Sequence, residues 1–191
     1  MLDLTIKFLS SQLNSYLKAV TGSGSNSVEA KASAIVDHAG KYVIDENGIG
    51  ATVINVEEER ILKSHSREYK LVNGHHVLLE PDLKINLYVM FAANFKVYDE
   101  GLKSISHVMT FFQSHSLFTP QIHPDLDPRI EKLSVELLSL NFEQLNQIWA
   151  YIGGKHLPSA IYKMRMLLIQ DNANTAIQPP LTKVQSKLST A

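Results

Sequence analysis

The sequence predicts an α+β fold, a single domain built from three main helices and a mixed or antiparallel sheet of about four to six strands. Three segments carry apolar residues at spacings of three and four, the period of an amphipathic helix. Between them lie segments whose side chains alternate in character, the period of a strand. The 191 residues also fit one domain of about 100–200 residues. We expect this domain over residues 1–170 and a flexible C-terminal tail over residues 171–191.

The first helix is expected over residues 2–20, because apolar residues recur there along one face. It is expected to end at residues 21–27, a run of glycine and small polar residues that forms a surface loop. A glycine-rich phosphate cradle is the alternative for this run. Such cradles end in Lys-Ser or Lys-Thr, which this run lacks.

The next segments read as strands. Residues 28–44 alternate loosely, and Asn47-Gly48 is a hairpin-type turn signal. Residues 49–56 carry apolar side chains at both parities, which predicts a strand covered on both faces. A second turn signal, Asn73-Gly74, precedes the clearest strand of the chain, residues 84–94. Because its two faces are both largely apolar, we expect this strand at the centre of the sheet.

The second half alternates helices and strands. Residues 96–114 have a helical apolar stripe, and three prolines in residues 115–128 interrupt regular structure. Residues 130–140 read as a strand with Leu133, Val135 and Leu137 on one face.

The third helix has the clearest boundary signals. Asn141 with Gln144 three residues on predicts a capping box, and Gly153-Gly154 predicts the end of the helix. Its apolar positions include Phe142 and Trp149. The last strand is expected over residues 159–170, where apolar residues alternate with basic ones, so that one of its faces is exposed.

Composition excludes several classes of function. The net charge of −1 comes from 18 basic and 19 acidic residues without a block of either sign, which argues against nucleic-acid and membrane-surface binding. No cysteine is present, so disulfides, thiolate metal sites and cysteine nucleophiles are excluded. The N-terminal residues lack the apolar core of a signal peptide, and we expect a protein made in the cytoplasm.

Candidate chemical sites are weak. His75 and His76 are adjacent, so on a strand they point to opposite faces, and the sequence has no HExxH pattern. The run Glu57-Glu58-Glu59-Arg60 allows an acid–base pair, but we favour a solvated strand end or an ion-pair site between subunits. No Gly-x-Ser-x-Gly elbow follows a strand. We therefore expect no catalytic residue, metal or cofactor.

Five strings, in order along the chain, resemble one family: residues 54–59, residues 87–95 with Tyr98 just beyond, residues 111–113, 145–149 and 157–165. They resemble the N-terminal domain of the tube-terminating cap proteins of extracellular contractile injection systems, of the antifeeding-prophage and virulence-cassette type. The resemblance covers about residues 5–170. The residues that carry it, expected to be mostly structural, are Asn55, Asn86, Tyr88, Phe91, Asn94, Phe111, Phe112, Gln113, Trp149, Pro158, Ser159 and Tyr162. For Trp149, Phe111 and Phe112 a contact between subunits is the alternative to a core position.

The resemblance implies a phage tail-terminator-like fold and a structural tail terminator. Such a protein caps the inner tube and engages the last sheath layer of a phage-tail-like contractile injection particle. It implies a ring homo-oligomer, a hexamer, whose partners are itself, the inner tube protein and the sheath protein, with no enzymatic activity and no cofactor. The protein is then part of the assembled or released particle. The alternative is a baseplate- or sheath-associated adaptor or binding module of the same particle, and an enzyme is the third class.

Two interfaces are predicted from charge and exposure. We expect Glu57, Glu58, Glu59 and Arg60 at the seam between subunits, facing a basic side chain of the next protomer. We expect Lys163 and Arg165, together with residues 171–191, to meet the sheath, an arm of which adds as an extra strand to an open edge. Some relatives carry long C-terminal extensions, whereas the tail here is short.

Overall fold

A computed structural model describes residues 1–22, 28–59, 68–72, 75–79, 83–168 and 177–178. It contains three helices, α1 (Leu2–Thr21), α2 (Tyr98–Ser114) and α3 (Phe142–Ile152). The strands are β1 (Ala30–Ala32), β2 (Gly48–Glu58), β3 (Glu68–Val72), β4 (His75–Leu79), β5 (Leu83–Asn94), β6 (Leu117–Phe118), β7 (Ile130–Leu137), β8 (Ser159–Leu168) and β9 (Ile177–Gln178).

Six strands form the main sheet, in the order β1-β2-β5-β8-β7-β6. β1 runs parallel to β2 and every other pair is antiparallel, so the sheet is mixed. This confirms the predicted fold class and the central position of β5. β3, β4 and β9 form a separate three-stranded sheet, in which the predicted turn at Asn73-Gly74 falls between two paired strands, although the turn itself lies outside the described residues.

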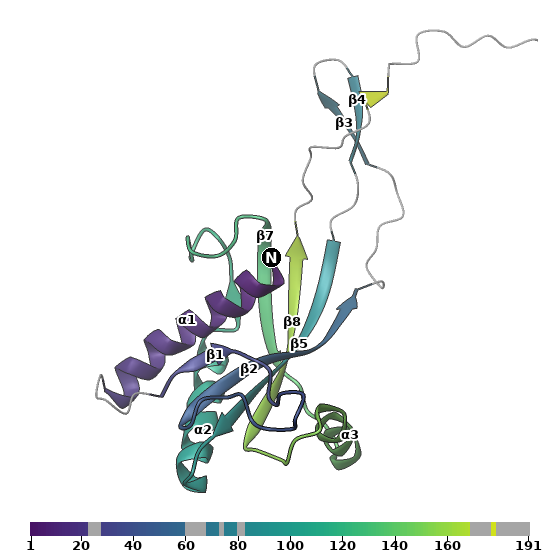
Figure 1. The fold of residues 1–191 in the computed structure, drawn as a ribbon. Coiled ribbons are helices and arrows are strands. Elements are labelled where there is room, and N and C mark those ends of the chain that lie inside the picture. Colours follow the sequence, from purple (N-terminus) through teal and green to yellow (C-terminus); the bar gives the residue numbers. More distant parts are fainter. Residues whose placement is uncertain (23–27, 60–67, 73–74, 80–82, 169–176, 179–191) are drawn as a thin grey trace, which may run out of the picture.

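The helices cover the two faces of the main sheet unequally (Figure 1). α1 and α2 lie against one face, where their apolar side chains join those of β5, β7 and β8 in the larger core. α3 lies on the other face, where Trp149 packs with Met90, Ala92 and Ile161 in a smaller core. The smaller core covers only one end of that face, so the other end is left to polar side chains.

The helix boundaries follow from local sequence. In α1, Ile6, Leu9, Leu13 and Leu17 are buried on one side, as the three-and-four spacing predicts. In α3 the predicted capping box forms: Asn141 Oδ1 accepts from the Gln144 N–H at 2.8 Å, and Gln144 Oε1 accepts from the Asn141 N–H at 3.1 Å.

The predicted strand over residues 28–44 is wrong in extent, since only Ala30–Ala32 pairs as a strand. The chain then turns back on itself, with one isolated bridge between Val36 and Tyr42. The Asp37 carboxylate accepts from the Ala39 and Lys41 N–H groups and stabilises this turn. A local side-chain bond of this kind competes with strand pairing and is hard to recognise from alternation alone.

The Asn47-Gly48 signal marks a turn but not a hairpin. Asn47 has a left-handed φ of 61°, and the Gly48 N–H donates to the Asp45 carbonyl at 3.0 Å. The strands before and after this turn are parallel, so they do not form the two arms of a hairpin.

Several apolar positions predicted on covered faces are exposed. On α2, Ile105, Val108 and Phe112 are buried, whereas the stripe continues into solvent at positions such as Tyr98. On α3, Phe142 is 94% exposed, because the helix packs on the smaller core through residues that follow it. These are Leu145, Ile148, Trp149 and Ile152. The other large apolar side chains of the predicted faces that are exposed are Val20, Val53, Val56, Val97, Leu102, Met109 and Leu137.

Candidate functional site

The part of the sheet that α3 leaves uncovered carries a continuous set of polar side chains from four strands. We call it the polar face: Asn55, Glu57 and Glu59 from the end of β2, Lys84, Asn86 and Tyr88 from β5, Lys163 and Arg165 from β8, and Lys132, Ser134 and Glu136 from β7. Cross-strand register builds it in rows. Asn55, Tyr88, Lys163 and Glu136 are successive partners across the sheet, and so are Glu57, Asn86, Arg165 and Ser134.

A β-bulge places β2 correctly for this face. The register between β2 and β5 shifts at Ile54, so that Val53 pairs with Val89 but Asn55 pairs with Tyr88. Simple alternation puts Asn55 on the same side as Val53, which is wrong. The extra residue turns Asn55 and Glu57 toward the polar face.

Tyr88 is the centre of the first row. Its hydroxyl donates to Glu57 Oε2 at 2.8 Å, and the Lys163 Nζ lies 5.7 Å from its ring centroid, within cation–π range. Burial, followed by the neighbouring Glu57 carboxylate, raises the pKa of Tyr88. The phenol therefore stays protonated and serves as a hydrogen-bond donor that fixes Glu57 in place.

Three residues of the second row, Asn86, Ser134 and Arg165, line a hollow of about 480 Å³. Its other lining residues are Glu59, Lys84, Ile85, Lys132, Met166 and Leu167. Asn86 is only 2% exposed, and its Nδ2 donates to Glu59 Oε2 at 3.0 Å. Its Oδ1 has no partner among the described residues. Arg165 Nη1 donates to Glu136 Oε1 at 2.8 Å across the sheet. The face thus combines charges of both signs, a pattern suited to contact with a complementary protein surface.

The structure places charged residues from the two separately predicted interfaces on one face of the sheet. Glu57 and Glu59 on β2 and Lys163 and Arg165 on β8 lie on one face, with only β5 between them. Glu58 is paired with Ile85, so alternation directs it to the opposite side. Arg60 and nearly all of the segment 171–191 lie outside the described residues.

An extra strand cannot add to β8, because β8 is paired on both sides, by β5 and β7. The main sheet has an unpaired edge elsewhere in the described part of the chain. β1 pairs with β2 only up to Ala51, and no described strand pairs with the outer side of β2 from Val53 to Glu58.

Five of the twelve motif residues that carry the resemblance are part of the two cores. Phe91, Phe112 and Tyr162 form a ring cluster with centroid separations of 5.2, 5.8 and 4.8 Å, and burial raises the pKa of Tyr162 to about 12. Phe111 and Trp149 are buried. The Asn94 side chain donates to the Ile44 carbonyl at 2.8 Å. Of the remaining motif positions, Gln113 and Asn55 are exposed, and Pro158 and Ser159 are half-buried.

The described residues contain no group of three or more His, Cys, Asp or Glu side chains that could hold a metal ion. His75 and His76 lie on β4, where only the backbone is described. Within the same residues, none of the helices has the length and apolar character needed to cross a bilayer. The side chains of the polar face offer hydrogen-bond donors, hydrogen-bond acceptors and charges of both signs. These groups suit binding to another protein surface.

Comparison with known proteins gives the same fold. One solved structure, the sheath/tube terminator of an extracellular contractile injection system (PVC) in its extended state, is 13% identical, with a TM-score of 0.53 over 97% of this chain. Another, the tube-terminating cap of the anti-feeding prophage (AFP), is 13% identical, with a TM-score of 0.56 over 94% of this chain. The alignments cover 64% and 60% of those longer chains. No curated protein sequence matches.

The family comparison covers nearly the whole chain. The sequence model of the family described as the Pvc16 N-terminal domain matches residues 5–183, a range that includes both cores, the polar face and all five sequence strings. The chain therefore belongs to the Pvc16 N-terminal domain family.

Proposed function

We propose that this protein is a structural tail terminator, which caps the inner tube and engages the last sheath layer of a contractile injection particle. The observation that carries the proposal is the family match over residues 5–183. It is supported by a fold shared with a sheath/tube terminator and a tube-terminating cap. The chain spans less than two thirds of those proteins, so the proposal assigns the terminating role to the part that it shares with them.

The surface supports an assembly role. A terminator contacts the tube, the sheath and its own neighbours, and each contact needs a large area with a few strong anchors. Phe142 and Tyr151, at the two ends of α3, are 94% and 86% exposed, and aromatic side chains of this kind are enriched at protein interfaces. The polar face supplies charges of both signs nearby on the same sheet face.

In this role the protein has no enzymatic activity and needs no cofactor. Its partners are further copies of itself in a ring, a hexamer, together with the tube and sheath proteins. Head-to-tail contacts between copies close into a ring when the rotation between neighbours divides a full turn. The protein is made in the cytoplasm and then becomes part of the particle, and residues 171–191 with Lys163 and Arg165 are proposed to meet the sheath.

The test is whether the purified chain forms a ring and binds tube ends. We expect light scattering to give a closed oligomer and electron microscopy to show it at one end of isolated tubes. Binding along the sheath or at the baseplate end instead would support the adaptor alternative. A monomer that binds neither tube nor sheath would contradict both.

The polar face gives a second prediction, that Glu57 and Glu59 contribute to the seam between subunits. The double variant Glu57→Lys/Glu59→Lys is expected to weaken the ring by roughly tenfold, because it replaces attraction to a basic side chain by repulsion. The effect should shrink as salt rises from about 0.05 to 0.5 M, since salt screens exposed charges. Light scattering across protein concentration measures it.

Two controls separate this effect from damage to the fold. Glu57→Gln/Glu59→Gln keeps acceptors for Tyr88 and Asn86 without the charge, so it should fall between the wild type and the double lysine variant. Glu143→Lys, on the exposed side of α3, changes the net charge without touching the polar face. A ring unaffected by the lysine pair, in a protein that remains folded, would remove these glutamates from the seam.

A further inference from the structure

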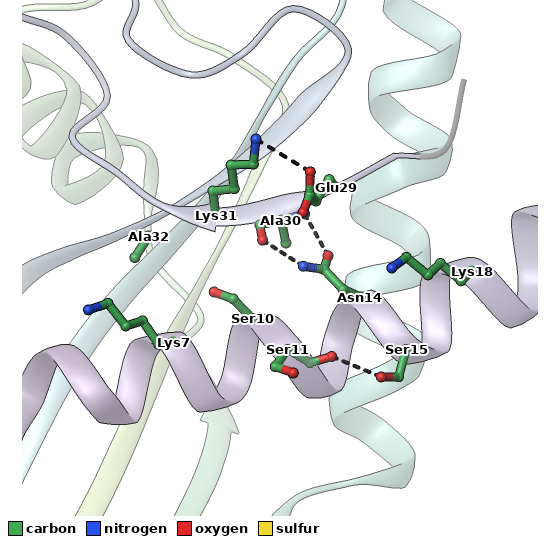
Figure 2. Close-up of a pocket in the computed structure, with 10 residues that line it drawn as sticks. All are labelled: Lys7, Ser10, Ser11, Asn14, Ser15, Lys18, Glu29, Ala30, Lys31 and Ala32. Atoms are coloured by element: carbon green, nitrogen blue, oxygen red, sulfur yellow. Dashed lines mark hydrogen bonds and ion pairs between the residues drawn. The ribbon is translucent and has the colours of Figure 1, made fainter. Parts of the chain in front are cut away.

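A polar groove separates α1 from β1 (Figure 2). Its volume is about 480 Å³, and it is lined from α1 by Lys7, Ser10, Ser11, Asn14, Ser15 and Lys18 and from the β1 side by Glu29, Ala30, Lys31 and Ala32. β1 is one of the two edge strands of the main sheet as described, so this groove runs beside an open sheet edge. Open edges can pair with a further strand unless something blocks them.

The Asn14 side chain already bonds to the outward-facing backbone groups of Ala30 on this edge. Its Oδ1 accepts from the Ala30 N–H at 2.7 Å, and its Nδ2 donates to the Ala30 carbonyl at 2.9 Å. Figure 2 shows the side-chain amide beside the strand, joined to it by this pair of bonds. A neighbouring strand makes the same two bonds to one residue of an antiparallel ladder. Asn14 therefore stands where the backbone of an added strand would otherwise lie.

Ala32, the next residue of β1 whose backbone faces outward, has no strand paired with it on that side in the described part of the chain. The Ile49 N–H donates to the Glu29 carbonyl and the Ser33 N–H donates to the Ala51 carbonyl, so the odd-numbered residues of this segment face β2. Because backbone groups alternate along a strand, the N–H and carbonyl of Ala32 point away from β2, as those of Ala30 do. Ala32 is exposed, and its small side chain leaves room for a second backbone to approach.

Ser10 marks the same place from the helix side. It is 6% exposed, and its Oγ has no hydrogen-bond partner among the described residues. Other hydroxyls on the helices, such as those of Ser15 and Ser104, donate to the carbonyl four residues earlier. The Ser10 side chain instead points from α1 toward β1 (Figure 2). A buried hydroxyl without a partner costs stability, which a bound segment would recover.

The charges along the groove favour an acidic occupant. Three lysines line it against one carboxylate, that of Glu29. Lys31 is paired with Asp45 at 2.9 Å and with Glu29 at 3.4 Å. Lys18 has no ion pair within the described part of the chain, and Lys7 has only an exposed contact with Asp3 at 3.6 Å. The two lysines of α1 are therefore the ones available to an incoming carboxylate.

We propose that an extended, acidic segment of a partner protein adds to the outer edge of β1 at Ala32 and lies in the groove between α1 and β1. Its backbone pairs with the N–H and carbonyl of Ala32, and one of its polar groups meets the Ser10 hydroxyl. Its carboxylates lie near Lys7, on the Ala32 side of Asn14, and Lys18 adds to the positive charge of the groove. This site is on the edge of the sheet and is distinct from the polar face, so it does not depend on the proposed function.

The test uses the full chain and two fluorescein-labelled eight-residue peptides, one alternating valine with glutamate and one alternating valine with lysine. We expect saturable binding of the valine–glutamate peptide by fluorescence anisotropy and at least roughly tenfold weaker binding of the valine–lysine peptide. Ala32→Pro removes the outward N–H without breaking a bond to β2, and should weaken binding by roughly tenfold. Ala32→Val keeps that N–H, suits a strand and should bind within about twofold of the wild type.

Thermal unfolding shows whether each variant is folded. If Ala32→Pro does not fold, Lys7→Glu/Lys18→Glu decides the outcome, because it should reverse the preference between the two peptides. Absence of saturable binding, equal binding of both peptides, or unchanged binding by a folded Ala32→Pro protein would each overturn the proposal. The capping of tubes is measured separately, so failure here leaves the terminator role untouched.

Discussion

Replacing Phe91 with alanine is expected to lower the free energy of unfolding by about 3–5 kcal/mol. Phe91 is 1% exposed at the centre of β5, and its ring contacts those of Phe112 and Tyr162. Removing the ring loses its burial and leaves a cavity beneath α2, which the sheet cannot close. Since domains are stable by about 5–15 kcal/mol, this loss leaves the protein close to unfolding. Denaturant titration followed by circular dichroism measures it.

Gln113→Ala is the matched control, because Gln113 carries the same family resemblance but is exposed at the end of α2. It should change stability by less than about 0.5 kcal/mol. A Phe91→Ala protein within about 1 kcal/mol of the wild type would contradict the core assignment. The comparison separates motif residues that maintain the fold from those left available for partners.

Sequence periodicity located the long elements well. α1, α2, α3, β5 and β8 agree with prediction to within about two residues at each boundary, because each has a sustained apolar pattern. The capping box at Asn141 fixed the start of α3 for a local reason that needs no tertiary context. Short segments carried less information. The three residues of β1 are held by β2 and Asn14, and neither contact is visible in local alternation.

The polar face was only partly predictable. Its charged residues were recognised as exposed, but the bulge at Ile54 and the strand order that join β2, β5 and β8 are non-local. Two separate charge clusters were therefore predicted where the structure has one surface. Asn86 was recognised as a motif position, while its buried, unpartnered Oδ1 became evident only from packing.

The groove beside β1 had no sequence signal. Ser10 is one of several serines on an amphipathic helix, and nothing in its spacing distinguishes it. Asn14 likewise reads as a polar residue on the solvent side of α1. Its pairing with Ala30 depends on where the helix crosses the sheet edge, which is a property of the tertiary structure.

The largest expected effect on assembly comes from removing the protein altogether. Subunits that join head to tail without closing leave, after each addition, the same kind of surface on which the next one adds. Growth of this kind has no end built into its contacts, and a different protein that covers the last surface stops it. Without a terminator we expect inner tubes of unregulated length, and sheath that is not held at the distal end.

Rescue experiments separate loss of capping from secondary effects. Supplying the wild-type chain from a plasmid should restore tubes of uniform length, and Gln113→Ala should do the same. Phe91→Ala should not restore the uniform tube length at a temperature where that variant is unfolded. Tube and sheath proteins should be present at unchanged levels in all strains, as measured by immunoblotting.

The most direct measurement is the distribution of inner-tube lengths, by electron microscopy, in particles assembled with and without this chain. A narrow distribution that becomes broad and extends to longer tubes when the chain is missing is the predicted result. Tubes that keep their narrow distribution without it would show that another protein ends their growth and would contradict the terminator role.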